Sequence, residues 1–145
     1  MTEVGLLCIG DQTEGLAAVR GLLAPARLRE VALETVPDEA ALIRRWLRQW
    51  SDTQGLALVL TIGGIGLGSR ERVPEATAEL LERPLPGLAE LMRLAGLQKT
   101  RAAALSRGLA GVRGKTLILN LPATDTGVAL EAALPVIPAA LAAIR

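Results

Sequence analysis

Four short apolar runs constrain the fold of this chain more strongly than any other feature of its sequence. They lie at Val4–Ile9, Leu56–Thr61, Leu109–Val112 and Thr116–Leu121. Short runs of this kind are typical of buried strands, and a strand that is apolar on both faces has to be covered on both sides. The runs therefore predict a sheet that lies between two layers of helices.

Segments with the apolar spacing of helices separate these runs. Helices are expected over Glu14–Ala24, from Pro37-Asp38 to Trp50, over Pro74–Leu81 and Pro86–Ala95, and from about Gly127 to the end of the chain. A fifth strand is expected over Arg27–Val36, where apolar residues alternate loosely, and Pro138 should kink the last helix because it lacks a backbone donor. Strands that alternate with helices predict one α/β domain with a mainly parallel sheet covered on both faces.

The composition excludes several kinds of chemistry. The chain has no His, which excludes His-ligated metal sites, Ser-His-Asp and Cys-His nucleophiles and His general bases. Cys8 is the only cysteine and lies in an apolar run, so we expect a small buried side chain there. The 16 basic and 15 acidic residues are interspersed, and Trp46 and Trp50, expected in the core or a subunit interface, are the only aromatic residues. The sequence therefore gives no case for nucleic-acid binding.

The sequence predicts neither a membrane protein nor an exported one. The longest uncharged stretch, Ala132–Ile144, is too short to span a bilayer and contains two prolines. The first residues, MTEVGLLCIGDQ, have no basic segment and reach Asp11 too soon for a signal peptide. A cytoplasmic location without a membrane partner is expected.

A glycine-rich turn follows the apolar run that ends at Thr61. It holds Gly63, Gly64, Gly66 and Gly68, which allow positive φ angles and a close approach of the backbone to a ligand. Consecutive exposed amides can bind an anion, and ligands of parallel sheets bind at the carboxyl ends of the strands. The turn lacks the Gly-Lys-Ser/Thr of a Walker loop and fits the dinucleotide fingerprint poorly. Two interpretations stay open on composition alone, a ligand-binding turn and a tight connection from strand to helix.

The residues around this turn resemble the signature of the molybdopterin-binding domain, T-x-G-G-T-G, R-D and T-P-E-A-T. The corresponding residues here are Thr61-Ile-Gly-Gly-Ile-Gly, Arg70-Glu71 and Pro74-Glu75-Ala76-Thr77. Further matches lie at Val36–Glu39, Pro86-Gly87, Glu90, Met92-Arg93, Ser106-Arg107, Gly111-Val112 and Leu117–Pro122, in the family's order along nearly the whole chain. Within the family the chain is similar to the single-domain Mog/MoaB group. That resemblance implies a three-layer α/β/α domain, a homotrimer, and transfer of AMP from Mg-ATP to the terminal phosphate of molybdopterin.

The resemblance also implies roles for individual residues. Asp38 and Glu71 match functional acidic positions and are the expected catalytic residues and Mg²⁺ ligands. Expected contacts of the substrates are Asp11, Thr61, Gly63, Gly64, Gly66, Arg70, Ser106, Arg107, Asn120 and Pro122. Structural alternatives stay open: Asp38 as a helix cap, Glu71 as a solvated charge, Arg107 in an ion pair, and Ser106 as a helix-terminal hydroxyl.

Departures from the family pattern cluster around the same turn. Ile65 and Val73 replace threonines, Glu71 replaces an Asp, and Ala123 and Asp125 stand in place of the family's G-S-P. The loop Gly10–Gly15 is also shorter than the family's. Two hypotheses follow: a divergent molybdopterin adenylyltransferase, or a paralogue that binds molybdopterin or a phosphate without transferring AMP. A structural subunit is a third hypothesis.

Overall fold

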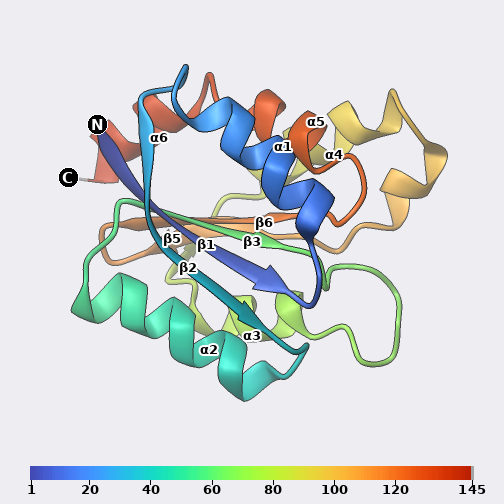
Figure 1. Cartoon of the computed structure of the whole chain (residues 1–145), viewed down its shortest axis with the longest axis horizontal. Helices are drawn as coiled ribbons and strands as arrows, with labels where there is room; N and C mark the ends of the chain where they lie inside the picture. Colours follow the sequence, from blue (N-terminus) through green and yellow to red (C-terminus); the bar gives the residue numbers. More distant parts are fainter. Residues whose placement is uncertain (145) are drawn as a thin grey trace.

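The computed structural model describes residues 1–144, which form a six-stranded sheet covered on both faces by helices (Figure 1). The strands are β1 (Thr2–Ile9), β2 (Leu28–Val36), β3 (Leu58–Ile62), β4 (Arg83–Pro84), β5 (Ala110–Arg113) and β6 (Thr116–Leu121). Their order in the sheet is β2-β1-β3-β6-β5-β4. The first four in this order are parallel, whereas β5 and β4 each run antiparallel to their neighbour. The predicted mainly parallel sheet is confirmed.

The helices form two layers, as Figure 1 shows. One layer consists of α1 (Thr13–Leu23), α4 (Pro86–Leu97), α5 (Thr126–Ala133) and α6 (Ile137–Ile144), and the other of α2 (Ala40–Arg48) and α3 (Val73–Leu80). A π-helix, η1 (Gln49–Thr53), extends α2, and a 3₁₀ helix, η2 (Arg101–Leu105), follows α4. The three-layer α/β/α architecture is therefore confirmed.

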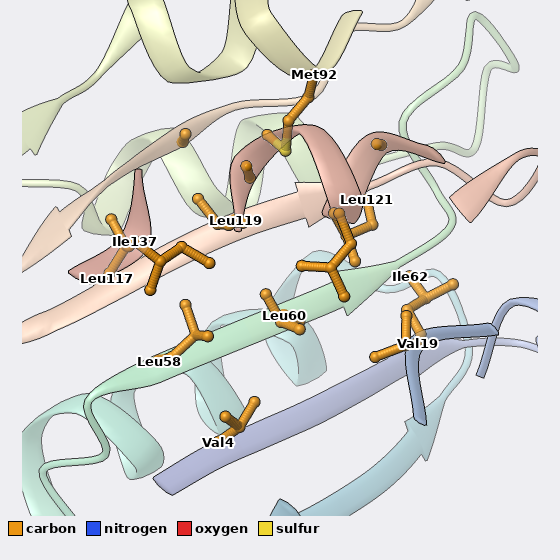
Figure 2. Close-up of a cluster of buried hydrophobic side chains, with 14 of the residues drawn as sticks. Val4, Val19, Leu58, Leu60, Ile62, Met92, Leu117, Leu119, Leu121 and Ile137 are labelled. Atoms are coloured by element: carbon orange, nitrogen blue, oxygen red, sulfur yellow. The ribbon is translucent and has the colours of Figure 1, made fainter. Parts of the chain in front are cut away.

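The apolar strands supply the core on both faces of the sheet. In β3 every residue is buried, with Leu58, Leu60 and Ile62 packed toward α1, α4, α5 and α6 (Figure 2). Val59 packs on the other face, toward α2 and α3. Trp50 is 1% exposed and lies in the second of these clusters, and a Cβ at Gly5 would come within 2.8 Å of its ring. Close packing of a strand against an indole therefore explains why β1 contains a glycine.

The C-terminal helix differs from the prediction. It is two helices, α5 and α6, bent by 57°, and the break lies at residues 134–136 instead of at Pro138. Pro135 lies in the break, whereas Pro138 occupies the first turn of α6, where no backbone donor is required. Within residues 1–144 no single helix is long and apolar enough to cross a bilayer, although α5 and α6 together meet that criterion as a bent pair.

The sheet topology brings three loops to one edge. The parallel strands β1, β3 and β6 are neighbours, so the segments after Ile9, Ile62 and Leu121 all leave the sheet at its carboxyl end. The sequence predicts that ligands bind at this edge.

Candidate functional site at the carboxyl edge of the sheet

The glycine-rich turn begins by continuing the sheet. The amide of Gly63 donates to the carbonyl oxygen of Leu121 at 3.0 Å, and Gly63 and Gly64 have φ angles of +95° and +73°. A Cβ on Gly63 would collide with the Gln12 amide, whose Nε2 donates to the Ile9 carbonyl oxygen at 2.8 Å. Glycine is therefore required at residues 63 and 64 by backbone conformation, and the Gly63 amide is already used in the fold.

The side chain of Glu71 binds two amides of the glycine-rich turn, and one of them, that of Gly66, is an amide that the sequence assigns to a phosphate. Its Oε1 accepts from the Gly66 amide at 2.9 Å, and its Oε2 accepts from the Gly68 amide at 2.6 Å. Glu71 is half-buried and is not the solvated charge of the alternative interpretation. The turn binds an anion, as its glycines suggest, but that anion is a carboxylate of the same chain.

Asp38 joins the end of β2 to the start of α3. Its Oδ1 accepts from the Arg72 amide at 2.9 Å, and the cap residue of its own helix is Glu39, without a side-chain cap. Burial raises the pKa of Asp38, as do the charges of Glu71 and Glu75, while the bond from Arg72 opposes the rise. No described residue donates to Oδ2 of Asp38.

The guanidinium of Arg107 binds backbone carbonyl oxygens of the glycine-rich turn. Its Nε donates to the Gly66 carbonyl oxygen at 2.8 Å and its Nη2 donates to the Glu71 carbonyl oxygen at 3.0 Å. The backbone amide of Arg107 donates to the Ile65 carbonyl oxygen at 2.8 Å, and its Nη1 bonds the Glu75 carboxylate. Hydrogen bonding to Arg107 lowers the pKa of Glu75. The ion pair of the alternative interpretation is present, and it anchors the turn to α3.

Asn120 and Thr61 belong to a buried network. Nδ2 of Asn120 donates to the hydroxyls of Thr61 and Thr77 at 3.0 and 3.2 Å, and its Oδ1 accepts from the Leu109 amide at 3.0 Å. Thr61 and Thr77 have no exposed surface, and Asn120 is 2% exposed. This network ties β3, β6 and α3 together beneath the turn, and it uses both N–H donors of the Asn120 amide.

The remaining expected contacts lie around these elements. Oδ1 of Asp11 accepts from the amide and hydroxyl of Thr13 at 3.1 and 2.6 Å, and these bonds lower the pKa of Asp11. Arg70 is exposed, and Oγ of Ser106 accepts from the Gly108 amide at 3.2 Å at the end of η2. The carbonyl oxygen of Pro122 accepts from the Thr126 hydroxyl at 2.6 Å.

A cavity of about 380 Å³ opens beside the turn. This volume is within the range of small-molecule sites, roughly 300–1,000 Å³. The lining residues come from the turn, α4, η2, the segment 106–108 and the loop after β6: Gly64, Ile65, Gly66, Glu71, Ala89, Met92, Arg93, Gly96, Thr100, Ala102, Ala103, Leu105, Ser106, Gly108, Asn120, Pro122, Ala123, Thr124, Asp125 and Ala129. Ile65 is 4% exposed and packs near Gly108, so it forms part of the wall without closing the cavity.

The cavity divides the expected site residues into two groups. Gly64, Gly66, Glu71, Ser106, Asn120 and Pro122 line it, whereas Asp11, Asp38, Thr61, Gly63, Arg70 and Arg107 do not. Sequence reasoning missed the wall that α4 supplies through Ala89, Met92, Arg93 and Gly96. The spacing of these four residues, three and four apart, is the signal that places them on one helical face.

Comparison with known proteins identifies the family to which the chain belongs. The family described as "Probable molybdopterin binding domain" matches residues 14–141. The chain belongs to this family. The match contains the whole glycine-rich turn, both acidic residues and every element that lines the cavity.

Molybdopterin biosynthesis proteins of known structure share the fold over its full extent. The molybdopterin biosynthesis enzyme MoaB from Thermus thermophilus is 52% identical, with a TM-score of 0.92 over 99% of this chain and 96% of that one. A solved structure of MogA is 29% identical, with a TM-score of 0.87 and complete coverage of both chains. The molybdopterin adenylyltransferase of Haemophilus influenzae is 36% identical over 131 residues, which are 84% of this chain and 66% of that protein. The chain thus spans just under two thirds of the length of this relative.

Proposed function

We propose that this chain acts in molybdenum cofactor biosynthesis and transfers AMP from Mg-ATP to the terminal phosphate of molybdopterin. One observation carries the proposal: a cavity of about 380 Å³ lies directly against a glycine-rich turn that already binds an anion through its amides. The names of the relatives, a molybdopterin biosynthesis enzyme and a molybdopterin adenylyltransferase, support the same substrate and reaction.

In this proposal the apolar walls of the cavity bind the pterin. Ala89, Met92 and Leu105 offer surface for a flat ring system, while Gly66 and Glu71 form the side of the cavity that the glycine-rich turn supplies. An oxygen of the terminal phosphate would attack the α-phosphorus of ATP, a new P–O bond would form, and the bond to the β-phosphate would break with release of pyrophosphate. The amides of Gly66 and Gly68 would stabilise the phosphate charge once Glu71 leaves them.

Asp38 and Glu71 fit the needs of a magnesium ion that arrives with ATP. Mg²⁺ is bound through one or two carboxylates together with substrate phosphates and water, and it would neutralise phosphate charge here. Oδ2 of Asp38 is free of hydrogen bonds from described residues, while Glu71 has to give up its bonds to the two amides. Arg107 would keep the turn in place during this exchange by holding the Gly66 and Glu71 carbonyl oxygens.

A second function, binding without transfer, is favoured by the contacts of Glu71. A carboxylate that fills the turn competes with any phosphate for the same amides. The test is to incubate the protein with ATP, Mg²⁺ and molybdopterin and to follow the adenylylated pterin by mass spectrometry. Product formation that is abolished in Asp38→Asn supports transfer. Molybdopterin binding without product refutes transfer and supports the second function.

We further propose a homotrimer, following the resemblance to the Mog/MoaB group. Leu91, Leu94 and Leu97 of α4 are 38%, 60% and 37% exposed and provide apolar surface for association. Light scattering at micromolar concentration tests the proposal, and a monomer would contradict it. The cytoplasmic location stays a prediction from the sequence.

A further inference from the structure

Arg93 lies in the wall of the cavity without an acidic partner. It is half-buried on α4, and its Nε and Nη2 donate to the carbonyl oxygens of Ser106 and Gly108, both at 3.0 Å. Among residues 1–144 no carboxylate lies within 4.0 Å of its guanidinium, although Arg20, Arg29, Arg44, Arg107 and Arg113 all form such pairs. Arg93 is thus a cation held only by neutral acceptors.

The two bonds leave part of the guanidinium free. Nε and Nη2 form one edge of the planar group, and they point to the turn at residues 106–108. A guanidinium has five N–H donors, so the two hydrogens of Nη1 and one of Nη2 remain without a described acceptor. These three hydrogens lie along the end of the guanidinium that fits two oxygens of a phosphate or carboxylate.

The two acidic residues that line the cavity form no ion pair with Arg93. Glu71 is engaged by the Gly66 and Gly68 amides, and Asp125 is exposed and outside ion-pair distance. Of the described residues that line the cavity, Arg93 is the only basic one. The Ser106 hydroxyl, whose oxygen accepts from Gly108, has no described acceptor for its own hydrogen. The wall of the cavity therefore holds a half-buried cation with free N–H donors and a hydroxyl whose hydrogen has no described acceptor.

We propose that Arg93 binds the terminal phosphate of the pterin substrate, together with the Ser106 hydroxyl. The proposal rests on the proposed function, because it names the residue that selects the phosphorylated form of that substrate. Arg93 and Arg107 both involve the segment 106–108. Arg93 donates to the carbonyl oxygens of Ser106 and Gly108, and Arg107, which lies in this segment, donates to the carbonyl oxygen of Gly66. The shared turn couples the phosphate site to the glycine-rich turn, where the phosphate has to react.

A purely structural role for Arg93 gives a different set of results. If the residue only ties α4 to the turn at 106–108, its replacement should weaken the binding of every ligand of the cavity equally. If it binds phosphate, the loss should be confined to ligands that have one. The test therefore compares molybdopterin with its dephosphorylated form in wild type, Arg93→Gln and Arg93→Lys.

We expect Arg93→Gln to weaken molybdopterin binding by about 10- to 100-fold, as for loss of charge-assisted hydrogen bonds. Binding of the dephosphorylated form should change by less than about threefold, and Arg93→Lys should restore part of the difference because it keeps the charge. Arg101→Gln, on exposed η2 and outside the cavity lining, is the matched control and should bind both ligands as wild type does. Equal losses for the two ligands would overturn the proposal.

A second measurement separates this proposal from the proposed function. Titration with inorganic phosphate should shift the ¹⁵N resonance of Arg93 Nε in the wild-type protein, and Arg101 should not respond. If molybdopterin fails to bind but phosphate shifts Arg93, the proposed function fails and the anion site stands. If molybdopterin binds while neither Arg93 replacement nor phosphate has any effect, the anion site fails alone. If neither ligand binds, both proposals fail.

Discussion

Removal of the Glu71 carboxylate should tighten anion binding at the glycine-rich turn when Mg²⁺ is absent. In the structure this carboxylate accepts from the Gly66 amide at 2.9 Å and from the Gly68 amide at 2.6 Å. A phosphate that binds the same amides has to displace it first. Glu71→Ala removes the competing acceptor, whereas Glu71→Gln keeps its shape but loses its charge and one of its two acceptor atoms.

The size of the effect follows from the two hydrogen bonds. Bonds to charged groups contribute about 1.5–3 kcal/mol when buried, but one of these amides is exposed and the other part-buried, so about 1 kcal/mol each is a suitable estimate. A total of about 2 kcal/mol corresponds to roughly 30-fold in affinity. With Mg²⁺ present the sign should reverse for Mg-ATP, because the variant then lacks one of two expected metal ligands.

Calorimetric titration with inorganic pyrophosphate in EDTA, and then with ATP in Mg²⁺, measures both effects. Glu79→Gln is the matched control, since Glu79 lies on α3, pairs with Arg44 at 3.5 Å and does not line the cavity. It should bind pyrophosphate as wild type does. An unchanged or weaker affinity of Glu71→Ala in EDTA would refute the reasoning, because it would mean that Glu71 and the anion do not share the amides.

Three further predictions concern the residues that support the turn. Asn120→Ala should lower the free energy of unfolding by about 3 kcal/mol, since it strands buried groups that cost about 1–3 kcal/mol each, and Thr77→Val by about 1 kcal/mol, both measured by urea unfolding with tryptophan fluorescence. Because the pKa of Asp38 is raised above 3.8 in the fold, its contribution to stability is full below that pH and is lost as pH rises through the folded value. Asp38→Asn should therefore lose less melting temperature than wild type as the pH rises through the folded pKa of Asp38. The variant should melt above wild type at neutral pH. Arg107→Gln should speed amide hydrogen exchange at Gly66 and Gly68 and lower kcat more than it raises KM, whereas Glu75→Gln should have a smaller effect; unchanged exchange would contradict a positioning role for Arg107.

Local sequence patterns were sufficient to predict the layers of the fold. Largely apolar runs predict strands that are buried on both faces, and β3 and β6 are buried over their whole length. The helix break at residues 134–136 was not predicted. Leu130, Leu134, Ile137 and Leu141 continue a helical spacing across the break, so the apolar pattern alone hides it, although Pro135 lies within it.

The place of the site could also be predicted, whereas the partners of its side chains could not. Strand order determines which loops meet, and the segments after β1, β3 and β6 do meet at one edge. Which groups a carboxylate can bond depends on the length of its side chain. Glu71 is one methylene longer than the Asp of the family signature, and in the fold its two oxygens each bond a different amide of the turn. The departure that suggests a weakened catalytic site in the sequence is thus, in the structure, a contact that a phosphate has to replace.

The wall formed by α4 could have been predicted in part. Leu88, Ala89 and Met92 are buried against the sheet, and Arg93 follows them on the same side of the helix. A cation in such a position costs free energy unless it has a partner. Glu90, three residues before Arg93, is the one acid at helical spacing on this side of α4, but it is exposed and forms no bond with Arg93. The bonds of Arg93 to two backbone carbonyl oxygens fit a structural tie as well as an anion site, and the comparison of molybdopterin with its dephosphorylated form separates these two roles.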